Sequence, residues 1–426
     1  MFSILRKRTA ASICFLVAAL VCLLAGYFPS VLLAEPLGTA APDHITLTWE
    51  GDPRTTETIS WRTDADTVAG QVEFVPSTAA GFHSAAVRRI EAGVESFSTN
   101  MGDMKLHSVT LTGLKPAASY LYRVGSGEIW SEPHSFTTAA VAVSRFKFLI
   151  FGDSQSGDYG IWQTTIHQAY QANQDAAFFI NMGDLVDVGQ DYSQWNGWFD
   201  AAQGVIDTIP AMPLTGNHEM YTPEHQFSLP LYFTTQFKLP LNGPAEMKRQ
   251  VYSFDYGNVH FVMLDSQAGE EREFLPTMLD SQKAWLEQDL AATDKPWKLV
   301  FLHRPPYSNK ETEDNAGIRE AFVPVLDQYH ADIVFSGHDH VYARTYPLRG
   351  GEVVDSTAQG TIYAATGRSG TKTYKKRFAQ DWNEFFYNPL EEPNYLTVEV
   401  QGDTLNVQAF SQSGELIDSW TVRHGQ

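Results

Sequence analysis

Five short apolar runs constrain the fold of this chain more than any other feature. The runs are nearly continuous rather than alternating, and they occupy residues 146–151, 176–180, 259–264, 299–302 and 333–335. A strand that is apolar on both faces has to be covered on both faces, as in the sheets of α/β proteins. Helical periodicity lies between the runs, at residues 161–174, 281–292 and 318–329. The sequence therefore predicts an α/β layered domain over residues 145–426, closed by an antiparallel hairpin at 395–410.

The preceding part of the chain has a different pattern. Short segments with a two-residue period are separated by turn residues, at 45–49, 58–62, 71–75, 108–111, 120–124 and 135–138. This pattern predicts an all-β sandwich over residues 40–140. Leu114-Lys115-Pro116, followed by Tyr120 and Tyr122, resembles a fibronectin type III turn and strand. No titratable cluster occurs here, which favours a packing or spacer module.

Residues 1–34 form a candidate targeting segment. Arg6-Lys7-Arg8 precede an uncharged apolar stretch from about residue 10 to residue 28, and Ala34 is a candidate cleavage position. This order is typical of a signal peptide or an uncleaved signal anchor. We therefore expect a secreted or extracytoplasmic protein that contacts a membrane only through this segment. Both cysteines, Cys14 and Cys22, lie inside it, so the exported part has no disulfide framework.

The overall charge limits the partners of the chain. The formal net charge is -20 at pH 7. A polyanion of this kind repels nucleic acids and anionic lipids, so we expect no nucleic-acid binding surface. The sequence gives no indication of the oligomeric state.

Side chains that can bind metal ions follow the predicted strands within one to three residues. They occur in five segments, as Asp153, Asp184, Asn217-His218-Glu219, His303 and His338-Asp339-His340. Ligands gather at the carboxyl ends of the strands in open α/β sheets, so these segments are expected to converge. Glycine precedes four of them and permits a sharp turn. One Gly-Asp or Asn-His pair indicates only a turn, whereas five ordered segments indicate a site.

The chemistry of these side chains is coherent. Two metal ions roughly 3.5–4 Å apart can hold the attacking and leaving oxygens of a phosphoryl displacement, and water on such a metal becomes a nucleophile near neutral pH. A bridging carboxylate is needed between the ions. The mixture of carboxylate, amide and imidazole favours iron, manganese or zinc over calcium.

The motif order GD, GDxxD, GNHE, H, GHxH resembles the calcineurin-like metallophosphoesterase superfamily. Together with the β-sandwich, it is similar to the purple acid phosphatase branch, and residues 338–344 and 251–254 add further matches. The resemblance implies a β-sandwich core flanked by helices, two metal ions per chain and a phosphate-ester substrate.

The resemblance also implies roles for individual residues. Asp153 and His340 would hold the first metal and Asp184 would bridge both, while the second would be held by Asn217, His303 and His338. His218 would bind a phosphate oxygen or protonate the leaving group as a general acid. Arg304 and Arg344 would either neutralise substrate charge or form ordinary ion pairs.

Two positions depart from the family pattern. Asp187 stands where purple acid phosphatases have a tyrosine that gives the ferric form its colour, which predicts a colourless enzyme. Gln155 stands where other members have a histidine ligand. Gln155 would coordinate weakly through its oxygen, leaving a labile first metal, or contact bound phosphate instead. Asp187 would orient a ligand or a water molecule.

Two other functions remain open at this stage. One is a catalytically weak, metal-binding ectodomain whose β-sandwich mediates surface binding, and the other is a structural protein stabilised by its metals. The sequence does not identify the substrate or distinguish monoesters from diesters. Aromatic residues in 221–249 would stack on a nucleoside or pack internally, and packing is favoured. Asp265 also ends a strand and is interpreted as structural.

Overall fold

The computed structural model describes residues 37–311 and 315–424, and the chain from Leu37 onward forms one compact unit. The predicted targeting segment at 1–34 lies outside the described residues, as do both cysteines. Within the described part of the chain, no helix has the length and apolarity needed to cross a membrane.

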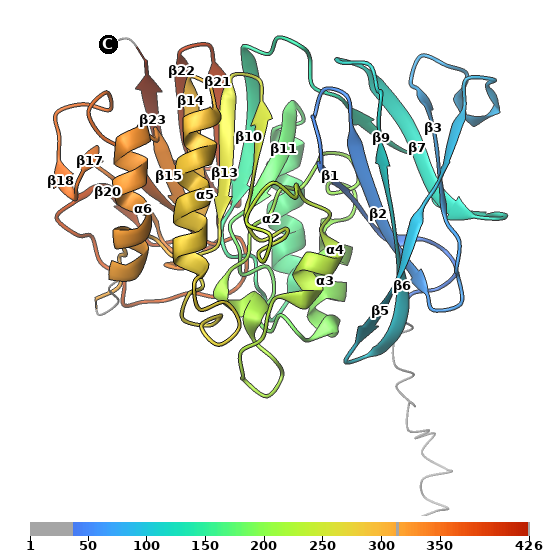
Figure 1. Ribbon diagram of the computed structural model, residues 1–426, viewed down its shortest axis with the longest axis horizontal. Coiled ribbons are helices and arrows are strands. Elements are labelled where there is room, and N and C mark those ends of the chain that lie inside the picture. Colours follow the sequence, from blue (N-terminus) through green and yellow to red (C-terminus); the bar gives the residue numbers. More distant parts are fainter. Residues whose placement is uncertain (1–36, 312–314, 425–426) are drawn as a thin grey trace, which may run out of the picture. The chain divides into compact units, whose positions relative to one another are not determined.

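The first part of this unit is a β-sandwich, as predicted (Figure 1). One antiparallel sheet has the order β1-β2-β6-β5, with bounds Asp43–Thr48, Glu57–Asp64, Gly102–Leu111 and Gly93–Thr99. The other has the order β4-β3-β7-β8, with bounds Arg88–Glu91, Gln71–Pro76, Ser119–Ser126 and Ile129–Trp130, and β9 (His134–Thr137) pairs with β7. A short 3-10 helix, η1 (Gly81–His83), follows β3. The alternating residues supply the core, which includes Ile59, Trp61 and Phe74.

Strand β4 was not predicted, because its pattern carries no apolar signal. Its four residues are Arg-Arg-Ile-Glu, and three of them are exposed. The strand is held by backbone pairing with β3, and Arg89 also forms an ion pair with Glu73. Sheet pairing therefore defines this edge strand where side-chain burial does not.

The second part contains two larger sheets. A five-stranded sheet has the order β11-β10-β21-β22-β23, with bounds Ala176–Asn181, Arg145–Phe151, Asn394–Gln401, Thr404–Ser411 and Leu416–Arg423. A seven-stranded sheet has the order β12-β13-β14-β15-β19-β16-β20, with bounds Tyr252–Tyr256, Val259–Leu264, Trp297–Leu302, Ile333–Ser336, Ile362–Thr366, Tyr342–Thr345 and Asn383–Tyr387. Strands β17 (Leu348–Arg349) and β18 (Glu352–Val353) form a separate ribbon. The predicted C-terminal hairpin is confirmed as β21 and β22, which pair antiparallel.

The two large sheets pack face to face and helices cover their outer faces. Between the sheets, the ring of Phe178 lies 5.4 Å from that of Phe261. Helices α2 (Tyr159–Ala172) and α3 (Tyr192–Ala202) flank the five-stranded sheet, where the Trp162 ring is 5.2 Å from that of Phe151. Helices α5 (Met278–Ala292) and α6 (Ala316–Tyr329) share a core cluster with the outer face of the seven-stranded sheet. The predicted layered α/β fold is confirmed.

Parallel pairing brings the important strand ends together. Strand β10 runs parallel to β11, and β13, β14, β15 and β19 form a parallel series. Their carboxyl ends lead into the loops that carry the candidate ligands. Two short helices near these loops, η2 (Asn217–Met220) and α4 (Leu231–Gln236), were not predicted.

The β-sandwich shares packing with the layered part. Trp49 belongs to the same core cluster as Phe178 and Tyr256. The Tyr122 hydroxyl donates a hydrogen bond of 2.7 Å to the carbonyl of Asp207. The division at residues 40–140 and 145–426 stays a prediction, since the described chain forms one unit.

Candidate metal centre

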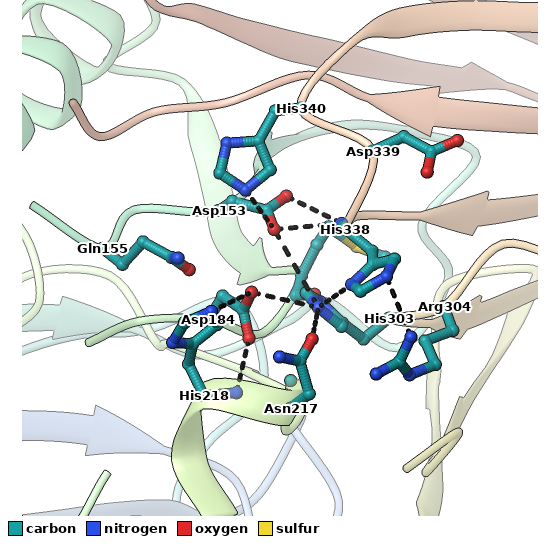
Figure 2. A network of polar contacts seen from close by, with 12 residues as sticks. Asp153, Gln155, Asp184, Asn217, His218, His303, Arg304, His338, Asp339 and His340 are labelled. Atoms are coloured by element: carbon teal, nitrogen blue, oxygen red, sulfur yellow. Dashed lines mark hydrogen bonds and ion pairs between the residues drawn. The ribbon is translucent and has the colours of Figure 1, made fainter. Parts of the chain in front are cut away.

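The candidate ligands converge from five segments onto one small volume (Figure 2). Asp153, Asp184 and His303 follow β10, β11 and β14, and His338 and His340 follow β15. Asn217 opens η2, whose preceding segment lies beside β11 through a hydrogen bond of 3.0 Å from Leu214 N to the Asn181 carbonyl.

Two groups of ligand atoms share one carboxylate. Asp153, Asp184 and His340 offer ligand atoms that lie within 4.8 Å of one another, and Asp184, His303 and His338 do the same. In the first group, His340 Nε2 lies 3.2 Å from Asp153 Oδ1. In the second, His303 Nε2 lies 3.2 Å from Asp184 Oδ2. Asp184 is therefore the residue that the two groups have in common.

Asn217 joins the second group. Its Oδ1 lies 3.2 Å from His303 Nε2, and His338 Nδ1 lies 3.2 Å from the same nitrogen. An amide oxygen and two imidazole nitrogens thus face a common point beside Asp184. This donor set fits a first-row transition metal better than calcium.

Backbone carbonyls orient two of the imidazole rings. His303 Nδ1 donates to the Met182 carbonyl at 2.8 Å, and His340 Nδ1 donates to the Lys372 carbonyl at 2.9 Å. Each bond fixes the ring so that Nε2 faces the carboxylates, which is the usual support for a metal-binding histidine. The residues present therefore fit the two metal ions that the sequence implies.

The backbone around the centre is strained. Asp184, His338 and His340 have φ values of 51°, 67° and 55°. Residues other than glycine rarely adopt this left-handed conformation, and such strain clusters at functional sites. Gly216 is needed for a different reason: a Cβ there would lie 2.2 Å from Asp184 Oδ1.

Glu219 is a buried residue that supports the centre without belonging to the predicted ligand set. Its carboxylate accepts hydrogen bonds from the backbone N–H groups of Asp184 (2.9 Å), Leu185 (2.8 Å) and Gly216 (2.6 Å). It therefore fastens the loop after β11 to the loop before η2. Burial and the charge of Asp184 raise the pKa of Glu219 to about 8.

The carboxylates and histidines of the centre shift one another's pKa. Burial alone would raise the pKa of Asp153 and Asp184, but nearby histidines, chiefly His340 and His303, hold both below the usual value. Burial alone would lower the pKa of His303, but the two carboxylates outweigh it and raise this pKa to about 9. Both carboxylates are thus ionised at neutral pH, whereas His303 is protonated and would release its proton when a metal ion binds.

Comparison with known proteins agrees with this geometry. Residues 146–342 match the calcineurin-like phosphoesterase family, and residues 42–138 match the N-terminal domain of purple acid phosphatases. The chain therefore contains a calcineurin-like phosphoesterase domain preceded by a purple acid phosphatase N-terminal domain. Its homologues include purple acid phosphatases, and it is a phosphatase hydrolase.

Individual relatives span most of the chain. Acid phosphatase type 7 of mouse (Mus musculus) is 25% identical over 437 residues, covering 94% of this chain and 95% of the mouse protein. Purple acid phosphatase 23 of Arabidopsis thaliana is 26% identical over 336 residues, covering 68% of this chain and 69% of the plant protein. The solved structure of purple acid phosphatase PPD1 from yellow lupin (Lupinus luteus) seeds has the same fold, with a TM-score of 0.75, 22% identity and coverage of 90% of this chain and 74% of the lupin chain.

His218 of this metallophosphoesterase lies at the edge of the metal centre. Its backbone N–H donates to Asp184 Oδ1 at 2.9 Å, and its ring Nε2 lies 4.0 Å from Asp184 Oδ2. Ring Nδ1 donates to the Asp187 carbonyl at 2.6 Å. Nε2 is therefore the atom that faces the cleft, and it lies 3.2 Å from Lys372 Nζ.

The two positions that depart from the family pattern form one polar network. Gln155 Nε2 donates to Asp184 Oδ2 at 2.9 Å, and its Oε1 accepts from Lys372 Nζ at 2.8 Å, in the amide orientation that satisfies both atoms. The carboxylate of Asp187 forms an ion pair with the same lysine. Asp187 therefore pairs with Lys372 and His218, and Gln155 contacts the carboxylate of Asp184.

The two candidate arginines differ in location. Arg304 lines the cleft, where its Nη1 donates to His338 Nε2 at 2.9 Å, and its Nη2 forms an ion pair with Glu270 at 2.6 Å. Arg344 forms ion pairs with Glu384 and Asp418, and it is not among the residues lining the cleft. The geometry at Arg344 matches the ion-pair interpretation rather than substrate contact.

An open cleft of about 500 Å³ leads to the centre. Besides the expected residues, its wall includes Tyr221, which begins the predicted rim at 221–249, and Lys310, Tyr374 and Arg377, which sequence reasoning missed. Lys310 and Arg377 follow no strand directly and carry no motif. The run Lys-Thr-Tyr-Lys-Lys-Arg at 372–377 was a visible signal, because it is strongly basic in an acidic chain.

The remaining expectations concern packing residues. Asp265 is fully buried and accepts hydrogen bonds from Thr215 Oγ1 (2.6 Å) and Gln267 N (2.8 Å), a structural arrangement. In the predicted rim, Phe233 and Phe237 are completely buried, whereas Phe227 is 47% exposed and stacks on Tyr221. Internal packing accounts for the two buried rings.

Proposed function

We propose that this chain is an exported phosphomonoesterase whose two metal ions are iron, manganese or zinc. The ligands would be Asp153 and His340 for the first ion, Asp184 for both, and Asn217, His303 and His338 for the second. The observation that carries this proposal is the position of Asp184, whose carboxylate lies within 4.8 Å of ligand atoms from both groups.

When bound, the two ions would supply positive charge and an activated water molecule for attack on phosphorus. The chain itself would position the phosphate ester in the cleft between Asn217, His218 and Arg304. His218 Nε2 would donate a proton to the leaving oxygen or hold a phosphate oxygen, because Nδ1 is already committed to the Asp187 carbonyl. Arg304 would neutralise charge that develops on the phosphoryl group.

The departures at Gln155 and Asp187 would shape the first metal site. Gln155 supports the bridging carboxylate through its amide N–H, so the first ion would lack one strong ligand and exchange readily. With Asp187 in place of the tyrosine, the iron-loaded enzyme should be colourless.

Export rests on the N-terminal pattern, in which Arg6-Lys7-Arg8 precede an apolar segment. The β-sandwich at about 40–140 would then act as a packing module beside the catalytic part at about 145–426.

Metal analysis combined with turnover tests the proposed function. The purified chain should contain two transition-metal ions and hydrolyse para-nitrophenyl phosphate faster than bis(para-nitrophenyl) phosphate. A metal-loaded chain that hydrolyses neither ester would contradict the proposal and support a binding role.

A further inference from the structure

A short basic segment forms part of the cleft wall. Residues 371–377, here called the basic loop, have the sequence Thr-Lys-Thr-Tyr-Lys-Lys-Arg and lie between β19 and β20. Four of these seven residues are cationic, although the whole chain carries a net charge of -20. Such a local reversal of sign concentrates anions at a site that the remaining charge would repel.

Hydrogen bonds hold the basic loop against residues of the candidate metal centre. Several hydrogen bonds attach the loop and its preceding residue. They include those from Gly370 N to the Asp153 carbonyl at 3.0 Å, from His340 Nδ1 to the Lys372 carbonyl at 2.9 Å, and from Arg377 Nε to the Asp339 carbonyl at 3.0 Å. Figure 2 shows the Asp339 side chain turned away from the centre that His338 and His340 face. The loop backbone and the guanidinium of Arg377 are therefore held beside the candidate ligands.

Arg377 is the cation of the loop that lines the cleft. Its guanidinium lies 4.4 Å from the centre of the Tyr374 ring, and Tyr374 also lines the cleft. Its hydrogen bonds go to the carbonyls of Asp339 and Lys376. Across residues 37–311 and 315–424, no carboxylate forms an ion pair with Arg377. Among the described residues its guanidinium thus has no ion-pair partner, in contrast to Lys372, which pairs with Asp187.

We propose that the basic loop selects substrates that carry a second phosphoryl group on the leaving side, with Arg377 contacting that group. This inference rests on the proposed function. The metal ions and Arg304 would serve the phosphoryl group that is cleaved, so a further cation lining the same cleft, Arg377, suits a further anion. A guanidinium binds phosphate through paired N–H donors, and stacking on Tyr374 keeps its plane oriented.

The reaction balances as a simple hydrolysis. The oxygen of one water molecule forms a bond to phosphorus, and the bond from phosphorus to the leaving oxygen breaks with its electron pair on that oxygen. The leaving oxygen takes up one proton, which the water has lost. The products are inorganic phosphate and a leaving group that still carries the second phosphoryl group.

Arg377→Gln and Arg377→Lys test the inference in the metal-loaded full chain. For ADP and fructose 1,6-bisphosphate, Arg377→Gln should raise KM roughly tenfold, the size of a lost charge-assisted hydrogen bond. KM for para-nitrophenyl phosphate, which has one phosphoryl group, should change less than twofold. For ADP and fructose 1,6-bisphosphate, Arg377→Lys should have a KM much closer to the wild-type value than Arg377→Gln has. A rise in KM for ADP alone would mean that the basic loop selects phosphoanhydrides. A rise in KM for both substrates would mean that it also selects bis-esters.

A binding measurement separates this inference from the proposed function. Calorimetry should show that wild-type protein binds methylenediphosphonate more tightly than methylphosphonate, and that Arg377→Gln removes this difference, whether or not any ester is hydrolysed. Arg423→Gln is the matched control, since Arg423 is exposed on β23 beside Thr404, at the opposite end of the five-stranded sheet. Equal losses of affinity for both phosphonates, or equal losses of turnover on all three substrates, would overturn the inference.

Discussion

At the scale of single residues, the centre depends on close approaches that few side chains permit. Asp184 receives the backbone N–H of His218 on one carboxylate oxygen and faces His303 with the other. Its own backbone lies in the left-handed region and is held by Glu219. The position of this carboxylate is therefore set by neighbouring backbone groups before any metal binds.

His218→Ala should keep both metal ions but lower turnover. The ring is not among the two groups of clustered ligand atoms, so the imidazole can be removed without removing a ligand. Loss of a general acid lowers kcat by roughly 10²–10⁴. Metal analysis and para-nitrophenyl phosphate kinetics measure the two effects separately. Unchanged kcat would remove His218 from the mechanism.

Gly216→Ala should disrupt the centre through steric contact alone. Gly216 has a φ of -106°, which any residue adopts, but a Cβ there would lie 2.2 Å from Asp184 Oδ1. The carboxylate would have to move, at a cost of about 1–3 kcal/mol, and metal content should fall. Gly157→Ala is the control, because a Cβ at Gly157 meets no atom within 4 Å. Equal metal content in the two variants would contradict this account.

At the scale of elements, parallel strands explain why so much of the site was predictable. Asp153, Asp184 and His303 each follow a buried apolar strand, and their convergence follows from the shared edge at which parallel strands end. Arg377 and Lys310 could not be found in this way, because loops without periodicity bring them to the cleft. Strand β4 was missed for a related reason, since its side chains are exposed and only its backbone pairing defines it.

A buried histidine links strand β13 to its neighbours and should make stability depend on pH. His260 forms hydrogen bonds with Asp255 on β12 (2.8 Å) and Asp289 on α5 (2.9 Å). Burial lowers the pKa of His260, but these carboxylates outweigh it and raise the pKa to about 9 from 6.5. Because the folded pKa is the higher one, the stabilisation is complete below about pH 6.5 and is lost as the pH rises through about 9.

His260→Gln should remove this pH dependence. The shift corresponds to up to about 3 kcal/mol of folding free energy between the two pH limits. Unfolding by urea at pH 6.5 and pH 9.5 should show a larger fall in wild-type stability than in the variant. Identical falls would mean that His260 is not protonated in the folded protein.

At the scale of the whole molecule, the β-sandwich and the layered part share a core. Trp49 follows β1, and its ring lies 5.5 Å from that of Tyr256 and 5.3 Å from that of Phe178. Two backbone hydrogen bonds also join β1 of the sandwich to the layered part. They run from Leu47 N to the Ile206 carbonyl at 2.9 Å and from Ala211 N to the Leu47 carbonyl at 2.8 Å. The sandwich therefore completes the fold of the part that carries the centre.

Trp49→Ala should destabilise both parts together. Truncating a buried tryptophan lowers the free energy of unfolding by about 3–5 kcal/mol. Because the two parts share the core around Trp49, both should become less stable. Calorimetry should record one unfolding transition at a lower temperature, with activity lost over the same range. Trp130→Ala, on the half-exposed strand β8, is the matched control. Two separate transitions in the wild type would show that the parts unfold independently.

The central claim is that two metal ions share the Asp184 carboxylate. The most direct test is anomalous scattering from crystals of the wild type and of Asp184→Ala, grown with manganese and collected near its absorption edge. The wild type should show two peaks roughly 3.5–4 Å apart, with Asp184 between them, and the variant should lose at least one. A single peak in the wild type, or two peaks that persist in Asp184→Ala, would contradict the account.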